Sequence, residues 1–274
     1  MGNITYRDLT TLEDFAAVVE LERVIWGPGY DEVVPVPILA VTVMRGGILI
    51  GAFDLSRMIG FVYSLPGLKH GKPTQWSHMA GVLEAYRGDG VGYQLKVLQR
   101  DRSIAMGLNL VEWTYDQMQA MNAHLNFAKL GVVAEEYEIN VYGISSSPLH
   151  KGNPTDRFVA EWFVNETRVA ERLRGGAPLA PVLTVECAVA AQGSGEWLEP
   201  ANVDRSLDAK RISVEIPMGF TGMLAQAPDL ALEWRMTTRE IFTTYFARGY
   251  RAIEFFLDRA QRKGAYLMVR HAKN

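Results

Sequence analysis

The sequence predicts a mixed α+β protein in which a sheet is flanked by helices. Apolar runs of strand length alternate with longer stretches that have helical spacing. One pair of strand-like runs is joined by a short polar link, as in an antiparallel hairpin, and another pair flanks a helix, as in a parallel crossover. An apolar fraction of 48% and a charged fraction of 22% are ordinary for a folded chain of 274 residues.

The chain is expected to open with a strand at residues 4–9 and a helix at 11–27. Thr11 is a suitable cap for this helix because its hydroxyl can accept from a first-turn amide, and acidic residues follow it. The positions that repeat with helical spacing are Phe15, Val18, Val19, Glu22 and Trp26. Prolines interrupt residues 30–37, which we expect to form a loop before a short apolar helix at 38–45.

A hairpin is predicted next, from strands at 46–54 and 58–67. A polar loop at 69–74 then leads into a strand at 75–83. The following helix, 90–107, has an apolar face and ends at Gly107. The first half is completed by a strand at 108–115, a helix at 118–131 and one or two strands at 132–143.

Ser, Pro, Gly and Asn cluster at residues 145–155, so a boundary is expected between a first domain, 1–144, and a second domain, 145–274. The second domain is predicted to contain a long helix at 228–249. Its predicted strands are 157–165, 181–190, 211–217 and 250–258. Because a strand, a helix and a strand follow one another as in the first half, this α+β half is open to interpretation as a degenerate second copy.

Composition excludes several classes of function. The net charge is −3 and the pI is about 6.0, with no basic block, so no nucleic-acid partner is expected. No run of eighteen apolar residues and no signal-like leader occur, so we expect a cytoplasmic protein without a membrane partner. The one cysteine, Cys187, has no disulfide partner within the chain and is expected to be a small buried residue. The five histidines form no close helical pair, so no metal site is expected.

The junction between the strand 75–83 and the helix 90–107 carries the main chemical signal. It reads Arg87, Gly88, Asp89, Gly90, Val91 and Gly92. Backbone amides at a helix N-terminus attract anions, and glycines let a phosphate approach them closely. Arg87 is placed to add a charge-assisted contact. The spacing fits neither the dinucleotide fingerprint nor the Walker A loop. We therefore expect a cradle for another phosphate-bearing ligand.

This junction resembles the acyl-CoA-binding motif of the GNAT superfamily, the CoA-dependent N-acyltransferases. Val82, Tyr86, Arg87 and the three glycines match the family form V-x-P-x-x-R-G-x-G-x-G, and Glu84 stands where a proline is usual. The segment "NAHLNFAKLGV" is also similar to the family, and the resemblance covers about residues 1–143. It implies a splayed mixed sheet with acetyl-CoA or another acyl-CoA between the fourth and fifth strands.

The resemblance also implies roles for particular residues. The diphosphate would lie on the amides of Gly88, Asp89, Gly90, Val91 and Gly92. The pantetheine arm would pair with the backbone at Ala80, Gly81 and Val82, and would pass near Asn122. The family often uses a tyrosine as general acid, and Phe127 stands at that position here. Phe127 is therefore expected to pack against the cofactor arm or the core.

His78 is the candidate general base, because an amine must lose a proton before it attacks. It stands nine positions before Arg87, a spacing similar to that of a strand histidine in the serotonin N-acetyltransferases. Glu84 is a weaker candidate. The general acid is either another tyrosine (Tyr115, Tyr137 or Tyr142) or not needed, since a thiolate leaves without much help.

Three tryptophans and two arginines are interpreted structurally. Trp76, Trp113 and Trp162 are expected to lie in the core. Arg235 and Arg239, one helical turn apart, are expected on a solvated face, with an acidic ligand as the alternative.

The sequence thus favours an N-acyltransferase acting on a small amine or amino acid. The second half would close the acceptor pocket or build a homodimer. A CoA-binding sensor or interaction module without catalysis is the alternative.

Overall fold

The structure, a computed structural model, describes residues 4–27, 30, 32–143, 152–176 and 185–271. The chain divides into two compact units. The first unit holds Met1–Trp113 together with Phe163–Glu166, and the second holds most of Thr114–Asn274. Each unit combines a sheet with helices, which confirms the mixed α+β class.

The sheet of the first unit has its strands in sequence order, β1-β2-β3-β4-β5. Neighbouring strands are antiparallel except for β4 and β5, which are parallel and joined by a helix. The strands are β1 (Ile4–Asp8), β2 (Ile48–Asp54), β3 (Arg57–Lys69), β4 (Lys72–Val82) and β5 (Leu110–Tyr115).

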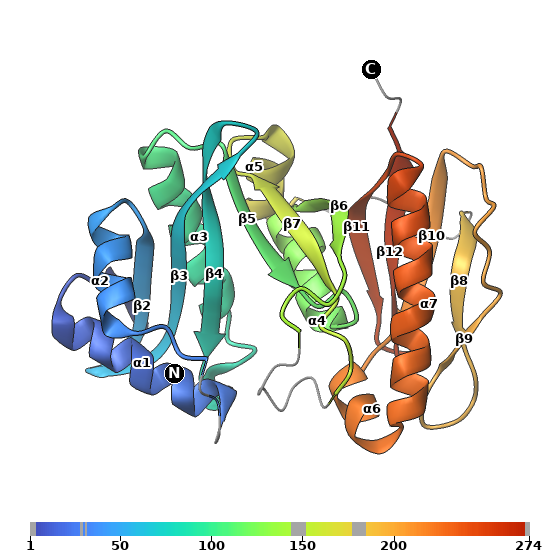
Figure 1. The fold of residues 1–274 in the computed structure, drawn as a ribbon, viewed down its shortest axis with the longest axis horizontal. Helices are drawn as coiled ribbons and strands as arrows, with labels where there is room; N and C mark the ends of the chain where they lie inside the picture. Colours follow the sequence, from blue (N-terminus) through green and yellow to red (C-terminus); the bar gives the residue numbers. More distant parts are fainter. Residues whose placement is uncertain (1–3, 28–29, 31, 144–151, 177–184, 272–274) are drawn as a thin grey trace. The chain divides into compact units, whose positions relative to one another are not determined.

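Helices cover both faces of this sheet. In Figure 1, α1 (Leu12–Trp26) and α2 (Val36–Met44) lie on one face, and α3 (Val91–Ala105) lies on the other. Thr11 caps α1 as expected, and a capping box with Asp14 completes its first turn. Buried residues of α1, such as Phe15 and Val18, share an apolar core with β2 and β3.

The hairpin of β3 and β4 is longer than the sequence indicated. Residues 69–74 were predicted as a loop, but the strands pair up to Lys69 and Lys72. A two-residue turn suffices because His70 (φ 48°) and Gly71 (φ 75°) both adopt positive φ, as hairpin turns of this length favour.

The strand β4 has two irregular features. Tyr63 pairs with Met79 and Ser64 pairs with Ser77, so His78 is the extra residue of a β-bulge. On its other edge, β4 pairs with β5 only at Gln75 and Trp76. Among the described residues, the remaining length of β4 has no strand partner on that edge.

The sheet of the second unit has the order β7-β6-β11-β12-β10-β8-β9. Its strands are β6 (Val133–Glu138), β7 (Arg157–Phe163), β8 (Glu186–Gln192), β9 (Glu199–Ala201), β10 (Arg211–Pro217), β11 (Tyr250–Asp258) and β12 (Lys263–Arg270). Its helices are α4 (Ala120–Ala123), the π-helix η2 (His124–Leu130), α5 (Thr167–Leu173), α6 (Phe220–Gln226) and α7 (Pro228–Ala247).

Several elements of the second unit differ from the expectation. The sequence pattern did not indicate β12. In the sheet, β12 lies between β10 and β11, the strands that precede and follow α6 and α7 in the chain. In the first unit, the corresponding strands β4 and β5 pair directly. The helix predicted at 118–131 is a short α-helix that continues as a π-helix and ends at Gly131.

Candidate functional site

The glycine-rich junction connects β4 to α3 through a short 3-10 turn, Glu84–Tyr86. Gly88 (φ 93°) and Gly90 (φ 81°) both adopt positive φ, which side chains disfavour. A Cβ added at either position would meet nothing within 4 Å. The two glycines are therefore needed for the backbone path, and they leave open space over the loop.

The N-terminus of α3 has no side-chain cap. Gly90 is the N-cap residue and has no side chain to accept from the first-turn amides; its carbonyl oxygen accepts the first helical hydrogen bond, from Gln94 N at 2.9 Å. First-turn amides and the helix dipole together favour a bound anion. The first turn itself contains no acidic residue.

Arg87 and Val91 fix the shape of the loop. Arg87 Nε donates to Val82 O at 3.1 Å, which ties the loop to the end of β4. The side chain of Val91 is buried and anchors the start of α3 in the core. Asp89 is exposed between the two glycines. An Arg87 contact to a phosphate stays a prediction.

Residues Ala80, Gly81 and Val82 lie on the part of β4 that has no partner on the β5 side. A Cβ at Gly81 would lie 2.8 Å from Ile25 Cδ1 and 3.2 Å from the Trp26 ring, so glycine permits α1 to pack closely on the strand. Val82 points to the other face, where its Cγ2 would be 3.7 Å from a Cβ at Gly92. Helix α1 thus packs on one face of this strand, and the start of α3 lies close to Val82 on the other.

His78 occupies the bulge of β4, where its ring packs edge-on against Tyr63 at a centroid distance of 6.0 Å. Part of the imidazole remains exposed. Removal from water by its neighbours lowers the pKa of His78 below the ordinary value. A lowered pKa favours the neutral imidazole, which is the form that a proton acceptor requires. Glu84, the weaker candidate, is exposed in the turn.

Glu22 is a buried carboxyl that the sequence pattern did not single out as functional. It is fully buried in α1, its Oε2 accepts from Val34 N at 2.9 Å, and its Oε1 has no hydrogen-bond partner among the described residues. Burial raises the pKa of Glu22 to about 7. The available signal was its place on the apolar stripe of the helix.

Asn122 and Phe127 belong to the second unit. Asn122 is exposed on α4. Phe127 is fully buried, with its ring 6.4 Å from that of Tyr115 and 5.6 Å from that of Tyr266. The alternative that Phe127 packs in the core is therefore the one that its contacts favour.

The three tyrosines left open as acids differ in environment. The Tyr115 hydroxyl is hydrogen-bonded to the Tyr266 hydroxyl, and the Tyr137 hydroxyl donates to Asp156. Burial raises the pKa of both tyrosines. Tyr142 is exposed, and its hydroxyl lies 2.5 Å from Thr114 Oγ1. Of the three, Tyr142 alone keeps an exposed side chain.

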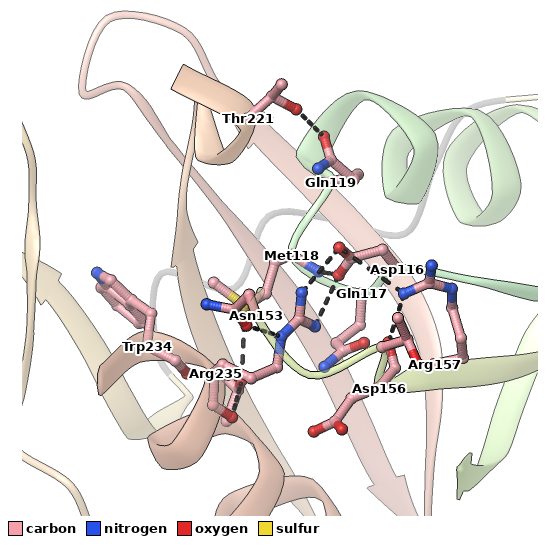
Figure 2. Close-up of polar contacts among 12 residues, drawn as sticks. Asp116, Gln117, Met118, Gln119, Asn153, Asp156, Arg157, Thr221, Trp234 and Arg235 are labelled. Carbon is pink, nitrogen blue, oxygen red and sulfur yellow. Dashed lines mark hydrogen bonds and ion pairs between the residues drawn. The ribbon is translucent and has the colours of Figure 1, made fainter. Parts of the chain in front are cut away.

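The prediction of a solvated face for Arg235 and Arg239 was wrong. Figure 2 shows Arg235 aimed at Asp116, and both of its Nη atoms donate to that carboxylate at 2.8 Å. Only 1% of the Arg235 side chain is exposed. Arg239 makes a similar pair with Asp156. The helical spacing correctly placed both arginines on one face, but carboxylates distant in sequence cover that face.

The remaining features carry little chemistry. Cys187 is half-buried, and its Sγ donates to Val189 O at 2.9 Å. In the described ranges, no three His, Cys, Asp or Glu side chains are grouped to hold a metal. None of the helices described here combines the length and apolar composition needed to cross a bilayer.

No protein-family model matches the sequence, and a search of curated proteins finds no significant match. Solved structures to which the chain is similar include a putative GNAT-family acetyltransferase from Desulfovibrio desulfuricans, at 14% identity over 59% of this chain and 99% of that one, with a TM-score of 0.45. Another is the ribosomal-protein-S18-alanine N-acetyltransferase from Escherichia coli, at 15% identity over 60% and 96%, with a TM-score of 0.48.

A third is a putative acetyltransferase from Salmonella typhimurium with its cofactor acetyl-CoA, at 17% identity over 60% and 95%, with a TM-score of 0.49. The first of these three structures is described as a member of the GNAT family, and the other two as acetyltransferases. Similarity at this level concerns the fold, so the function is argued from the residues of the chain itself.

Proposed function

We propose that the protein is an acyl-CoA-dependent N-acyltransferase whose first unit holds the CoA diphosphate at Gly88–Gly92. The observation that carries this proposal is the uncapped N-terminus of α3, preceded by two positive-φ glycines with open space above them. A diphosphate fits such a place because it needs several amide donors and no side chain in the way.

The free edge of β4 supports the same ligand. A pantetheine arm carries amide groups that can pair with a strand, as an added strand would. The edge at Ala80–Val82 lies directly before the loop, so one ligand that is both diphosphate and amide-bearing would use both features. Acyl-CoA has this composition, and it would supply a thioester whose acyl carbon is attacked by an amine.

The residues around this edge have separate roles in the proposal. His78 would accept a proton from the acceptor amine, since its lowered pKa favours the neutral imidazole. An N–H on β4 would stabilise the negative charge that develops on the thioester oxygen. The acceptor is proposed to be a small amine or amino acid, and the second half of the chain is proposed to close the acceptor pocket or form a homodimer.

A pair of matched glycine variants tests the diphosphate cradle. Gly90→Ala and Gly107→Ala lie at opposite ends of α3, both at positive φ with no atom within 4 Å of the added Cβ. Each substitution should cost about 1 kcal/mol of strain. Only Gly90→Ala should weaken CoA binding in calorimetry, because only that Cβ enters the cradle. Equal CoA affinity in the two variants would contradict the proposed loop.

Turnover is tested by incubating pooled amines and amino acids with acetyl-, propionyl- and succinyl-CoA and following free thiol. Thiol release that requires an amine is expected. CoA binding without thiol release from any pool would instead favour a non-catalytic CoA-binding module. No binding of CoA at all would refute both functions.

A further inference from the structure

Lys96 lies at the fork where β4 and β5 separate. The two strands pair at Gln75 with Val111 and at Trp76 with Glu112. The next pair in this parallel register would be Ser77 with Trp113. Lys96, from α3, contacts both of these residues: its Nζ donates to Ser77 Oγ at 3.1 Å and lies 3.5 Å from the centre of the Trp113 ring.

The ammonium of Lys96 is well satisfied at this place. Besides Ser77 and the face of Trp113, it donates to Gln99 Oε1 at 2.8 Å, one turn further along α3. Gln99 Nε2 in turn donates to Ser77 Oγ at 3.0 Å. A cation within about 6 Å of an indole face is attracted by the ring. The lysine is therefore tied to β4 by hydrogen bonds and to β5 by its position over the ring.

A buried lysine is a costly way to fill this space. Lys96 is 5% exposed, and burial lowers its pKa well below the usual range. An apolar side chain of the same length would extend the buried face of α3 and avoid the loss of hydration. Because Nζ contacts both members of the first pair that fails to form, it can hold these two side chains at a fixed separation and so limit the closer approach of the strands.

We propose that Lys96 is a positioning residue that wedges β4 from β5 and so keeps the Ser77–Val82 edge available to the pantetheine arm; this inference rests on the proposed function. Without the ammonium, Ser77 and Trp113 would be drawn into the next register pair. The Ser77–Met79 part of the β4 edge would then pair with β5, which ends at Tyr115, instead of facing the ligand. The diphosphate cradle, which is formed by the loop Gly88–Gly92, would be unaffected.

The test compares Lys96→Met with Gln99→Met, using CoA and ADP as ligands in calorimetry. Lys96→Met keeps the side-chain length and removes the ammonium. Gln99→Met removes a hydrogen bond to the same Ser77 Oγ and one acceptor of Lys96 Nζ, but it keeps the lysine side chain with its contacts to Ser77 and Trp113. ADP carries the diphosphate without the pantetheine arm. It therefore reports on the cradle alone.

Lys96→Met should weaken CoA binding about tenfold, the equivalent of one or two lost main-chain hydrogen bonds, and should leave ADP binding unchanged. Gln99→Met should leave both unchanged, and Lys96→Arg should restore most of the CoA affinity. Amide hydrogen exchange of unliganded Lys96→Met should show added protection within Ser77–Val82.

Three results would overturn the proposed role of Lys96. They are an equal loss of affinity for CoA and ADP in Lys96→Met, a loss of CoA affinity in Gln99→Met that matches the loss in Lys96→Met, and an unchanged CoA affinity in Lys96→Met. If Lys96→Met does not fold, Lys96→Gln, which keeps a hydrogen-bonding group without the cation, carries the same expectation. Failure of the proposed function would look different, because wild-type protein would then bind neither CoA nor ADP.

Discussion

Replacement of Glu22 by glutamine should remove a large pH dependence from the stability of the protein. The pKa of Glu22 is about 7 in the folded state, against an ordinary value of 4.5 for a solvated glutamate. An acid with a raised folded pKa binds more protons in the folded state than in the unfolded state between these two values. Its contribution to stability therefore falls as the pH rises through this window.

The size of the effect follows from the shift. The pKa difference of about 2.5 units, at about 1.4 kcal/mol per unit, corresponds to about 3.5 kcal/mol for complete titration, of which about 3 kcal/mol falls between pH 4 and pH 8. The structural reason is that Glu22 Oε1 is buried without a hydrogen-bond partner among the described residues, so ionisation creates an unsolvated charge. Glutamine can still accept from Val34 N and stays neutral throughout this range.

Urea unfolding followed by tryptophan fluorescence at several pH values measures this pH dependence of the free energy of unfolding. The wild-type free energy of unfolding should drop toward pH 8 relative to Glu22→Gln, by about 3 kcal/mol. Glu20→Gln is the matched control, since the Glu20 side chain lies on the same helix but is 72% exposed. Its profile should run parallel to that of the wild type. Parallel profiles for wild type and Glu22→Gln would refute the reasoning.

Three further outcomes are expected. In the wild type, the acid limb of the pH profile of kcat/KM should have its midpoint below 6.5, the ordinary pKa of histidine, because desolvation lowers the pKa of His78. His78→Gln should abolish this limb, and a limb that persists in the variant would show that His78 is not the base. Asp116→Asn should cost about 3–5 kcal/mol in urea unfolding, because it leaves the Arg235 cation buried without its carboxylate; adding Arg235→Met should recover part of this loss, and no recovery would contradict the pairing. Phe127→Tyr should lower the melting temperature without raising kcat, because the Phe127 ring is fully buried and the added hydroxyl would be removed from water. An increase in kcat would instead show that a tyrosine at this position can serve as the general acid.

Much of the first unit could be predicted from local sequence. Helix α1 begins after Thr11, as its capping residues indicated, and the glycines at 88 and 90 adopt the positive φ that they alone tolerate well. The order of the strands and helices up to β5 follows from periodicity and from the rule that a strand–helix–strand unit makes a parallel pair. These features depend on residues that are close together in the chain.

Other features required the tertiary structure. The partners of Arg235 and Arg239 are aspartates more than eighty positions earlier in the sequence, so their helical spacing alone pointed wrongly to a solvated face. The strand β12 lies between β10 and β11, an arrangement that no local pattern indicated. The bulge at His78 depends on the register of β4 against β3.

The sequence by itself determined the glycine-rich junction before α3, because backbone freedom and a helix start are encoded by neighbouring residues such as Gly88 and Gly90. Only the tertiary structure decided which polar groups would be buried, among them Glu22 and Lys96. The physical reason is that burial and pairing are set by what packs against a side chain. Those partners come from distant parts of the chain, as Ser77 and Trp113 do for Lys96.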